Sequence, residues 1–338
     1  NCFAEMLMAL IQMRTVNLVK LACAFNSGAK VDSRYKRIQR FFSTFTIDMS
    51  VVAGWVMDVF GLDKVYLSMD RTNWKWGKTD INILMLSAVY KGIAFPVLWS
   101  LLDKAGNSNT AERIVLIQRF VNRFGKNRIA GVLGDREFIG NDWFAWLKKE
   151  SIAFCMRIKK NMLTTNSRGT IVYAEELFWD LQVNQQRILS DSRKLWEQTV
   201  YLSALRLTDG ELLIVATDTL MTDPVAHYGK RWEIETLFGC LKSKGFHFED
   251  THIVNPARIN KLLVLLSVAF CWAHKVGEWR HDEKPIKFKK HGRKSQSLFR
   301  YGLDYLSDVF MNKNSRNLLF LPVLVALLSG RHVSTEKT

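Results

Sequence analysis

At about residue 64 the hydrophobic pattern of the chain changes from a helical period to short apolar runs. Three runs rich in β-branched and aromatic residues follow one another, separated by polar or glycine-containing breaks: KVYLSMD from Lys64, INILMLSAVY from Ile81 and GIAFPVLWSLL from Gly92. Runs of this kind predict three adjacent strands. We therefore expect a sheet to begin here.

The next segment alternates helices and strands. NTAERIVLIQRFVNRF has helical spacing, with Asn109 or Thr110 as its cap, and RIAGVLGD is typical of a strand that ends in an acid. NDWFAWLKKE then predicts a short helix, and IAFCMRIK predicts a fifth strand. Three strands, helix, strand, helix, strand is the order of a mixed α/β fold.

The flanking segments differ from this core. Residues 1–60 predict helices, and the amphipathic stretch 33–45 carries Arg34, Lys36, Arg37 and Arg40 on one side. Such a face suits DNA phosphates or a major groove, and a charged surface on a helical cap is the alternative. Further on, TVYLSALRL, the turn TDG and ELLIVATD predict a hairpin. We divide the chain into a helical DNA-binding region (1–60), the first part of the core (61–160), a β-rich insertion (161–225), the second part of the core (226–280), and a basic C-terminal segment with helices (281–338).

The charge of the chain indicates its partner. Its 48 Lys and Arg against 32 Asp and Glu give a formal net charge of +16, which favours nucleic acid over an anionic membrane. The longest apolar runs, 262–272 and 318–328, are about half the length of a membrane span, so we expect buried helices there. The five cysteines form no C-x-x-C pair, which fits a reducing cytoplasm, and His247 and His252 receive no metal role.

Two aspartates stand directly after apolar strands. Asp70 follows the first predicted strand and Asp135 the fourth, so both would emerge from a rigid sheet. If these strands pair, the two carboxylates come close, and like charges at close range are costly unless a cation lies between them. Carboxylate oxygens without cysteine favour Mg²⁺, with Mn²⁺ as a substitute, over zinc.

A third acid comes from YGKRWEIETLFGCLK, which begins at Tyr228. On a continuous helix, Tyr228, Arg231, Glu235 and Lys242 lie within roughly 60° of one another, whereas Glu233 lies on another side. Glu235 rather than Glu233 is therefore expected to meet the aspartates. A solvated surface helix is the alternative interpretation of the same charges.

The spacing Tyr-x2-Arg-x3-Glu-x6-Lys at these four residues resembles the signature of bacterial insertion-sequence transposases of the DDE class, in the insertion-sequence-four family. SMDRTNWKWGKTDINILMLSAVYKG and GVLGDREFIG resemble the blocks around the first two aspartates in that family. The resemblance extends to about residue 305. It implies an α/β fold with a ribonuclease-H-like mixed sheet, a β-rich insertion, an N-terminal helical DNA-binding region and C-terminal helices.

The resemblance also implies roles for single residues. Asp70, Asp135 and Glu235 match the catalytic, metal-binding acids, and Tyr228, Arg231 and Lys242 match groups that hold DNA phosphates. Arg136, Arg157 and Lys159 resemble contacts to the DNA backbone, although a solvated strand face explains Arg157 and Lys159 equally well.

The implied activity is DNA cleavage and strand transfer on double-stranded DNA, with the terminal inverted repeats and the target as substrates. A homodimer in the synaptic complex and a location in the bacterial cytoplasm at the nucleoid, without a membrane, complete this expectation. A ribonuclease-H-like nuclease without strand transfer and an inactive, transposase-derived repressor are the alternatives.

Three further residues are candidates for a place in the predicted site. Asp103 and Glu137 are expected to make structural hydrogen bonds, because of a loop position and an opposite strand direction respectively. Relatives that cut through a DNA hairpin place a tryptophan before the strand that precedes the signature helix, and this chain has leucine there. Trp196 could stack in its place, but a core or surface role is the simpler interpretation.

Overall fold

The computed structural model describes residues 2–290, 292–312 and 321–329. The chain forms two compact units that interleave in sequence. The helical unit comprises Asn1–Leu62, Trp74–Ile81 and Leu237–Thr338, and the sheet unit comprises Asp63–Asn73 and Asn82–Thr236. The division into five functional regions remains a prediction.

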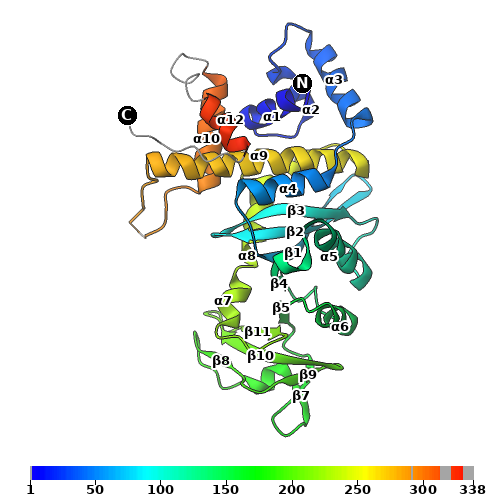
Figure 1. Cartoon of the computed structure of the whole chain (residues 1–338), viewed down its shortest axis with the longest axis vertical. Coiled ribbons are helices and arrows are strands. Elements are labelled where there is room, and N and C mark those ends of the chain that lie inside the picture. The colour runs from blue at the N-terminus through cyan, green and yellow to red at the C-terminus, as the bar shows by residue number, and fades with distance from the viewer. Residues whose placement is uncertain (1, 291, 313–320, 330–338) are drawn as a thin grey trace. The chain divides into compact units, whose positions relative to one another are not determined.

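A mixed sheet forms the core of the sheet unit (Figure 1). The described strands lie in the order β3-β2-β1-β4-β5-β11-β10-β8, with β9 paired to β10. Their bounds are β1 Val65–Trp76, β2 Thr79–Tyr90, β3 Ile93–Leu101, β4 Ile129–Gly134, β5 Phe154–Ile158, β8 Gln186–Ile188, β9 Arg193–Leu195, β10 Gln198–Arg206 and β11 Leu212–Thr217. β4 runs parallel to both β1 and β5, whereas β3 is antiparallel to β2 and β11 to β5. This is the predicted α/β fold with a ribonuclease-H-like sheet order.

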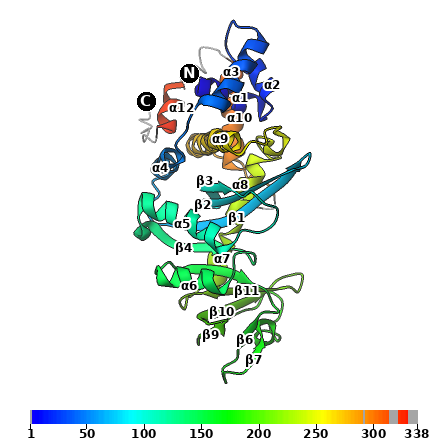
Figure 2. The same cartoon turned by 90° about the vertical axis from the view of Figure 1, so that its right-hand side faces the viewer.

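The continuous apolar runs in the sequence are explained by burial on both faces of this sheet. Every residue of β5 is buried, and so are the central residues of β2 and β3. Two helices, α5 Thr110–Phe124 and α6 Asn141–Lys149, pack beside the strands (Figure 2). Asn109 caps α5 in a reciprocal capping box with Glu112, as expected for one of its two predicted caps.

The region after β5 is rich in strands, as predicted, but most of them continue the main sheet. β11 pairs with β5 and β10 with β11, so the predicted hairpin extends the core. β6 Leu163–Thr165 and β7 Ile171–Tyr173 form a separate two-stranded sheet. The described part of the chain also contains short 3-10 turns: η1 Lys126–Arg128, η2 Ala174–Leu177 and η3 Phe248–Asp250.

Helices make up most of the helical unit, and several pack around its longest helix, α9 (Figure 1). They are α1 Cys2–Met13, α2 Leu18–Ala24, α3 Val31–Thr44, α4 Met49–Val59, α9 Pro256–Glu283, α10 Leu298–Met311 and α12 Leu321–Leu328. α9 and α10 cross where Gly277 faces Gly302, and a Cβ atom on either glycine would collide with backbone atoms of the opposite helix. Backbone-to-backbone approach therefore fixes this crossing.

α9 is longer than the apolar run predicted. By length and composition it could cross a membrane, but 78% of its most apolar window is buried inside the protein, as in a core helix. The predicted apolar run at 318–328 appears in part as α12, in which Leu324 and Leu327 are buried. Residues 318–320 of that run, like the end of the predicted C-terminal segment at 330–338, lie outside the described residues.

Candidate functional site

The parallel pairing of β1 with β4 brings two aspartates to neighbouring positions. Met69 lies opposite Gly134 in this pairing, and Asp70 and Asp135 follow directly. The predicted pairing of the first and fourth strands is thus confirmed. Asp70 differs from expectation in one respect, because β1 continues to Trp76 and places it inside the strand.

Tight packing fixes the turn that presents Asp135. A Cβ atom on Gly134 would lie 2.8 Å from the Met156 sulfur and from the Phe138 Cβ, so only glycine fits at the end of β4. The Asp135 carbonyl then accepts a hydrogen bond of 2.8 Å from the Phe138 amide. Asp135 is therefore held by a close turn rather than by a loose loop.

The helix expected from Tyr228 to Lys242 is broken in the structure. α7 (Pro224–Gly229) contains Tyr228, and α8 (Trp232–Leu241) contains Glu235. Between them the Arg231 amide donates to the Tyr228 carbonyl at 2.8 Å, an i to i−3 bond that tightens the chain into a 3-10 turn. The angles of a continuous helix are therefore wrong in detail, although the spacing from Arg231 to Glu235 still brings these side chains together.

The Arg231 guanidinium lies at the centre of the acidic residues. Its Nη1 is 3.4 Å from Asp70 Oδ2, and its Nη2 donates to Glu235 Oε1 at 2.6 Å. Its Nε donates to the Tyr228 hydroxyl at 3.0 Å, and that hydroxyl donates to Asp135 Oδ1 at 3.3 Å. One arginine and one tyrosine thus connect the three predicted catalytic acids.

Burial makes this cluster electrostatically unusual. The Arg231 side chain is 4% exposed and that of Asp70 is 19% exposed, whereas Glu235 is 53% exposed. Burial raises the pKa of Asp70 to about 6, and the Arg71 amide and Arg231 offset only part of that effect. Burial by itself lowers the pKa of Arg231, but its neighbours Tyr228 and Glu235 reverse this, and the pKa is raised.

The donor set suits a hard divalent cation. Three carboxylates converge without a thiolate or an imidazole, and the raised pKa of Asp70 shows that its ionised form lacks full compensation. Among the described residues, however, no three His, Cys, Asp or Glu side chains surround one position for a metal ion. Arg231 lies between Asp70 and Glu235 instead.

The match of the chain to a protein family indicates what this acidic cluster belongs to. Residues 61–272, more than half of the chain, match the family model described as the transposase DDE domain. The chain belongs to the DDE transposase family. The matched region contains all three acids as well as the segment that holds Tyr228 and Arg231.

Curated protein sequences and solved structures provide no further information on the function of the chain. A search of curated protein sequences found no match. Among solved structures, the piggyBac transposase in its synaptic complex with hairpin DNA is similar over 99% of this chain and 76% of that one, with 11% sequence identity and a TM-score of 0.49. A similarity of this size supports no argument about the function of the transposase described here.

Glu233 faces away from the acids of the DDE domain, in the direction that the sequence predicts. Its Oε2 accepts a hydrogen bond from the Tyr90 amide at 3.0 Å, and its Oε1 accepts one from the Gly92 amide at 3.1 Å. These amides lie at the last residue of β2 and in the turn that follows it, where Gly92 has a φ of 90°. Glu233 therefore ties the start of α8 to the sheet.

Two of the cations predicted to contact DNA form ion pairs with the same acidic residue of the protein. Arg157 lies 2.6 Å from Glu211, and the more exposed Arg136 lies 3.6 Å from the same carboxylate. Lys159 instead lines a hollow of about 650 Å³ with Lys194 and Trp196. The ring of Trp196 also meets that of Phe144 edge to face, with centroids 5.9 Å apart.

Sequence reasoning did not predict the parts that Arg71 and Glu211 play in these ion pairs. Glu137 pairs with Arg71 at 3.3 Å, which agrees with its predicted structural role, but the importance of Arg71 was not foreseen. Its position directly after Asp70 was the available signal. The role of Glu211 was also missed, and its place after the hairpin turn gave no comparable signal.

The remaining predicted cations belong to the helical unit. Lys242 lies 2.5 Å from Glu249 and 5.8 Å from the centre of the Trp74 ring. Arg34 donates hydrogen bonds to backbone carbonyls, among them those of Ala29 at 2.7 Å and Phe25 at 3.0 Å. Arg37 pairs with Glu5 at 3.1 Å, so of the three arginines predicted on α3 only Arg40 is exposed and has no side-chain partner among the described residues.

Proposed function

We propose that this transposase belongs to the insertion-sequence-four family, cleaves DNA at the ends of its own element and joins the freed 3′ ends to target DNA. The observation that carries this proposal is the convergence of Asp70, Asp135 and Glu235 around Arg231 and Tyr228. The pKa of Asp70, which burial raises to about 6, supports the same proposal, because perturbed carboxyl groups are concentrated at functional sites.

The proposed reaction consists of two phosphoryl transfers. In the first, a water oxygen bonds to the scissile phosphorus, the bond from phosphorus to the 3′ oxygen breaks, and that oxygen receives a proton. In the second, the new 3′ hydroxyl attacks a phosphorus of the target, and a target 3′ hydroxyl is released. A divalent cation, Mg²⁺ or in its place Mn²⁺, would offset the charge on the phosphoryl oxygens when bound by the three acids.

Residues of this chain prepare that site before DNA arrives. Tyr228 orients Asp135, and Arg231 holds Asp70 and Glu235 within a short distance of each other despite their like charge. Phosphate contacts by Tyr228 and Arg231 remain part of the proposal, and they require these side chains to exchange an acid for a phosphate. The DNA contacts proposed from the sheet unit are Arg136, Arg157 and Lys159, and Lys242 is proposed from the helical unit.

The proposed partners are the terminal inverted repeats and target DNA, both double-stranded, bound by a homodimer in the synaptic complex in the bacterial cytoplasm. The net charge of +16 supports a polyanionic partner. No membrane role is proposed, because α9 is a buried core helix.

A joining assay tests the proposal. Purified protein is incubated with Mg²⁺, a plasmid target and the DNA that flanks its own coding sequence, and the products are separated by size. Joined products that require Mg²⁺ support the transposase. Cleavage without joining indicates a nuclease, and binding with neither reaction indicates a repressor.

A further inference from the structure

One face of α3 carries polar side chains at the spacing of a single helical stripe. Lys36, Gln39, Arg40 and Ser43 follow one another at intervals of three, one and three residues, and all four are exposed. The opposite side packs into the helical unit through Ile38, Phe41 and Phe42. The stripe is therefore held rigidly and faces outward.

A hollow of about 650 Å³ runs along this stripe. Its lining consists of these four residues and Arg258, which comes from the first turn of α9. Three cations thus surround one hollow that no carboxylate lines. Within the described residues, Lys36, Arg40 and Arg258 take part in no salt bridge, although Asp32 precedes Lys36 by one helical turn.

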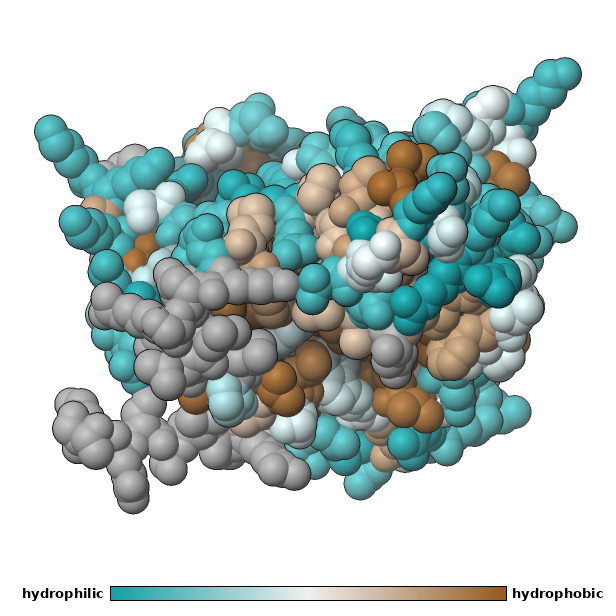
Figure 3. Space-filling view, turned by 90° about the horizontal axis from the view of Figure 1, so that it is seen from above, coloured by the Kyte–Doolittle hydropathy of each residue, from teal (hydrophilic) through white to brown (hydrophobic). Residues whose placement is uncertain are grey.

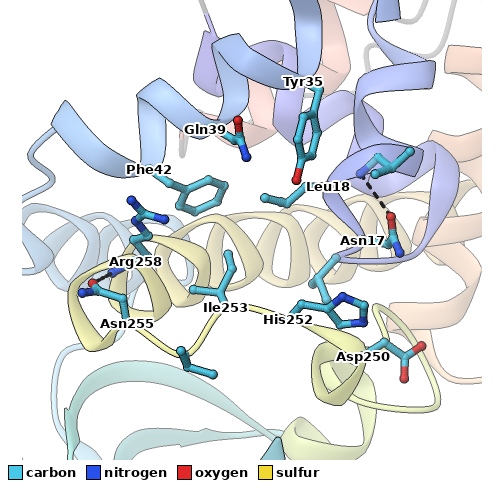
Figure 4. Close-up of a pocket in the computed structure, with 13 residues that line it drawn as sticks. Asn17, Leu18, Tyr35, Gln39, Phe42, Asp250, His252, Ile253, Asn255 and Arg258 are labelled. Atoms are coloured by element: carbon cyan, nitrogen blue, oxygen red, sulfur yellow. Dashed lines mark hydrogen bonds between the residues drawn. The ribbon is translucent and has the colours of Figure 1, made fainter. Parts of the chain in front are cut away.

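A second recess of about 350 Å³ lies next to this hollow, since Gln39 and Arg258 line both. Figure 4 shows Gln39 and Phe42 projecting from α3, with Arg258 beside Phe42. Asp250 lies in this second recess on the far side from Phe42, so the carboxylate is separated from the cationic stripe. The surface in Figure 3, where the helical unit faces the viewer, is largely hydrophilic with separate apolar patches.

We propose that α3 enters the major groove of the element end and that this hollow is its DNA contact. Lys36, Arg40 and Arg258 contact phosphates, and Gln39, between two of these cations, hydrogen-bonds a base edge. A cation without an acidic partner can neutralise a DNA phosphate and release the counter-ions that were bound there. Glutamine matches the donor and acceptor pattern that adenine presents in the major groove. This inference deepens the proposed function by naming the residues that recognise the end.

The choice of residues differs from the one that the sequence predicts. Arg34 and Arg37 have internal partners, so their loss disturbs the packing of α2 and α1 rather than a DNA contact. Arg258 is 215 to 222 residues from the stripe in the sequence, so the sequence alone does not associate it with the stripe. The DNA surface is thus built from two distant segments of one unit.

Binding measurements on single variants test the proposal. The full-length protein is titrated with a duplex from either flank of its coding sequence and with a shuffled duplex, at several salt concentrations. Lys36→Ala, Arg40→Ala and Arg258→Ala should each weaken binding to both duplexes and lower the salt slope by about one ion per lost contact. Gln39→Ala should weaken binding to the flanking duplex alone, by roughly five- to a hundred-fold.

Lys20→Ala is the matched control, because Lys20 is an exposed lysine of the same unit without a side-chain partner among the described residues. An equal loss in Lys20→Ala, or unchanged affinity and slope in the three cation variants, overturns the proposal. Equal loss for both duplexes in Gln39→Ala overturns the base contact. Cleavage of a pre-nicked end at saturating protein tests the catalytic proposal separately. The four variants of residues that line the hollow should still cleave this substrate once the DNA is saturated, whereas variants of the three acids should not.

Discussion

The acidic cluster of the sheet unit and the basic stripe of the helical unit treat charge in opposite ways. In the cluster, Arg231 is buried and already bonded to Asp70 and Glu235. On the stripe, Lys36 and Arg40 are exposed and unpaired among the described residues. With the proposed roles, the comparison contrasts acids that are positioned before DNA binds with cations that stay unpaired until they displace counter-ions from the DNA.

The difference follows from the elements that carry each site. Asp70 and Asp135 come from adjacent parallel strands of a buried sheet, where a misplaced charge is costly. The stripe lies on the outer face of one helix, where an extra lysine costs little. Substitution of a single residue should therefore have a large effect on cleavage or stability in the cluster and a smaller effect on DNA affinity on the stripe.

The largest expected effect is that of Asp135→Asn. The amide keeps the size of the carboxylate but removes the negative charge that a divalent cation requires, so strand cleavage should fall by orders of magnitude. DNA affinity and its salt slope should stay the same, as measured by titration of a flanking duplex. A parallel fall in affinity would show that the two regions are not separate in function.

Arg231→Ala should be the most destabilising change in the cluster. It leaves Asp70 and Glu235 without their shared cation, and removing one partner from a buried pair costs about 3–5 kcal/mol in the free energy of unfolding. Arg136→Ala is the control, because the Arg136 side chain is 51% exposed and should change stability by only about 0.5 kcal/mol. Chemical denaturation at pH 7 measures both, and equal effects would contradict the assigned burial.

The pH dependence of stability follows from Asp70. Its pKa of about 6 lies above the value of an unfolded aspartate, so the folded protein binds more protons between about pH 4 and 6 and loses stability as the pH rises through that range. Without divalent cations, Asp70→Asn should therefore gain about 1–3 kcal/mol at pH 7 and almost nothing at pH 4. Thermal unfolding in EDTA across this range would reveal it, and a gain that increases toward low pH has the wrong sign.

Glu233→Gln should have the smallest effect among the acid variants at pH 7. The amide oxygen can still accept one of the bonds from the Tyr90 and Gly92 amides, but the amide nitrogen cannot accept the other. One lost hydrogen bond costs about 1 kcal/mol in unfolding free energy, with cleavage near the wild-type rate. A loss of cleavage comparable to that of Asp135→Asn would give Glu233 a part in the chemistry.

The sequence was sufficient for those features that depend on local patterns. Apolar runs identified β1 to β5, and an acid after each of two runs located Asp70 and Asp135. Spacing was also sufficient to place Glu235 rather than Glu233 beside Arg231, since residues four apart lie one helical turn from each other.

What the sequence could not reveal depends on partners far along the chain. Arg37 pairs with Glu5 at a separation of 32 residues, and Arg71 with Glu137 at a separation of 66. The segment between α7 and α8 contains no proline, so the sequence does not indicate that the helix is broken there. A helical wheel also gives no information on the burial of Arg231, because it shows the direction of a side chain and not its depth.

The most direct test of the central claim compares the two glutamates of α8. Glu235→Gln and Glu233→Gln are purified, matched for thermal stability, and assayed on intact and pre-nicked ends with Mg²⁺. If Glu235 completes the acidic site, its variant binds ends normally but cuts slower by orders of magnitude, while the Glu233 variant cuts at nearly the wild-type rate. An inactive Glu233 variant beside a fully active Glu235 variant would contradict the site proposed here.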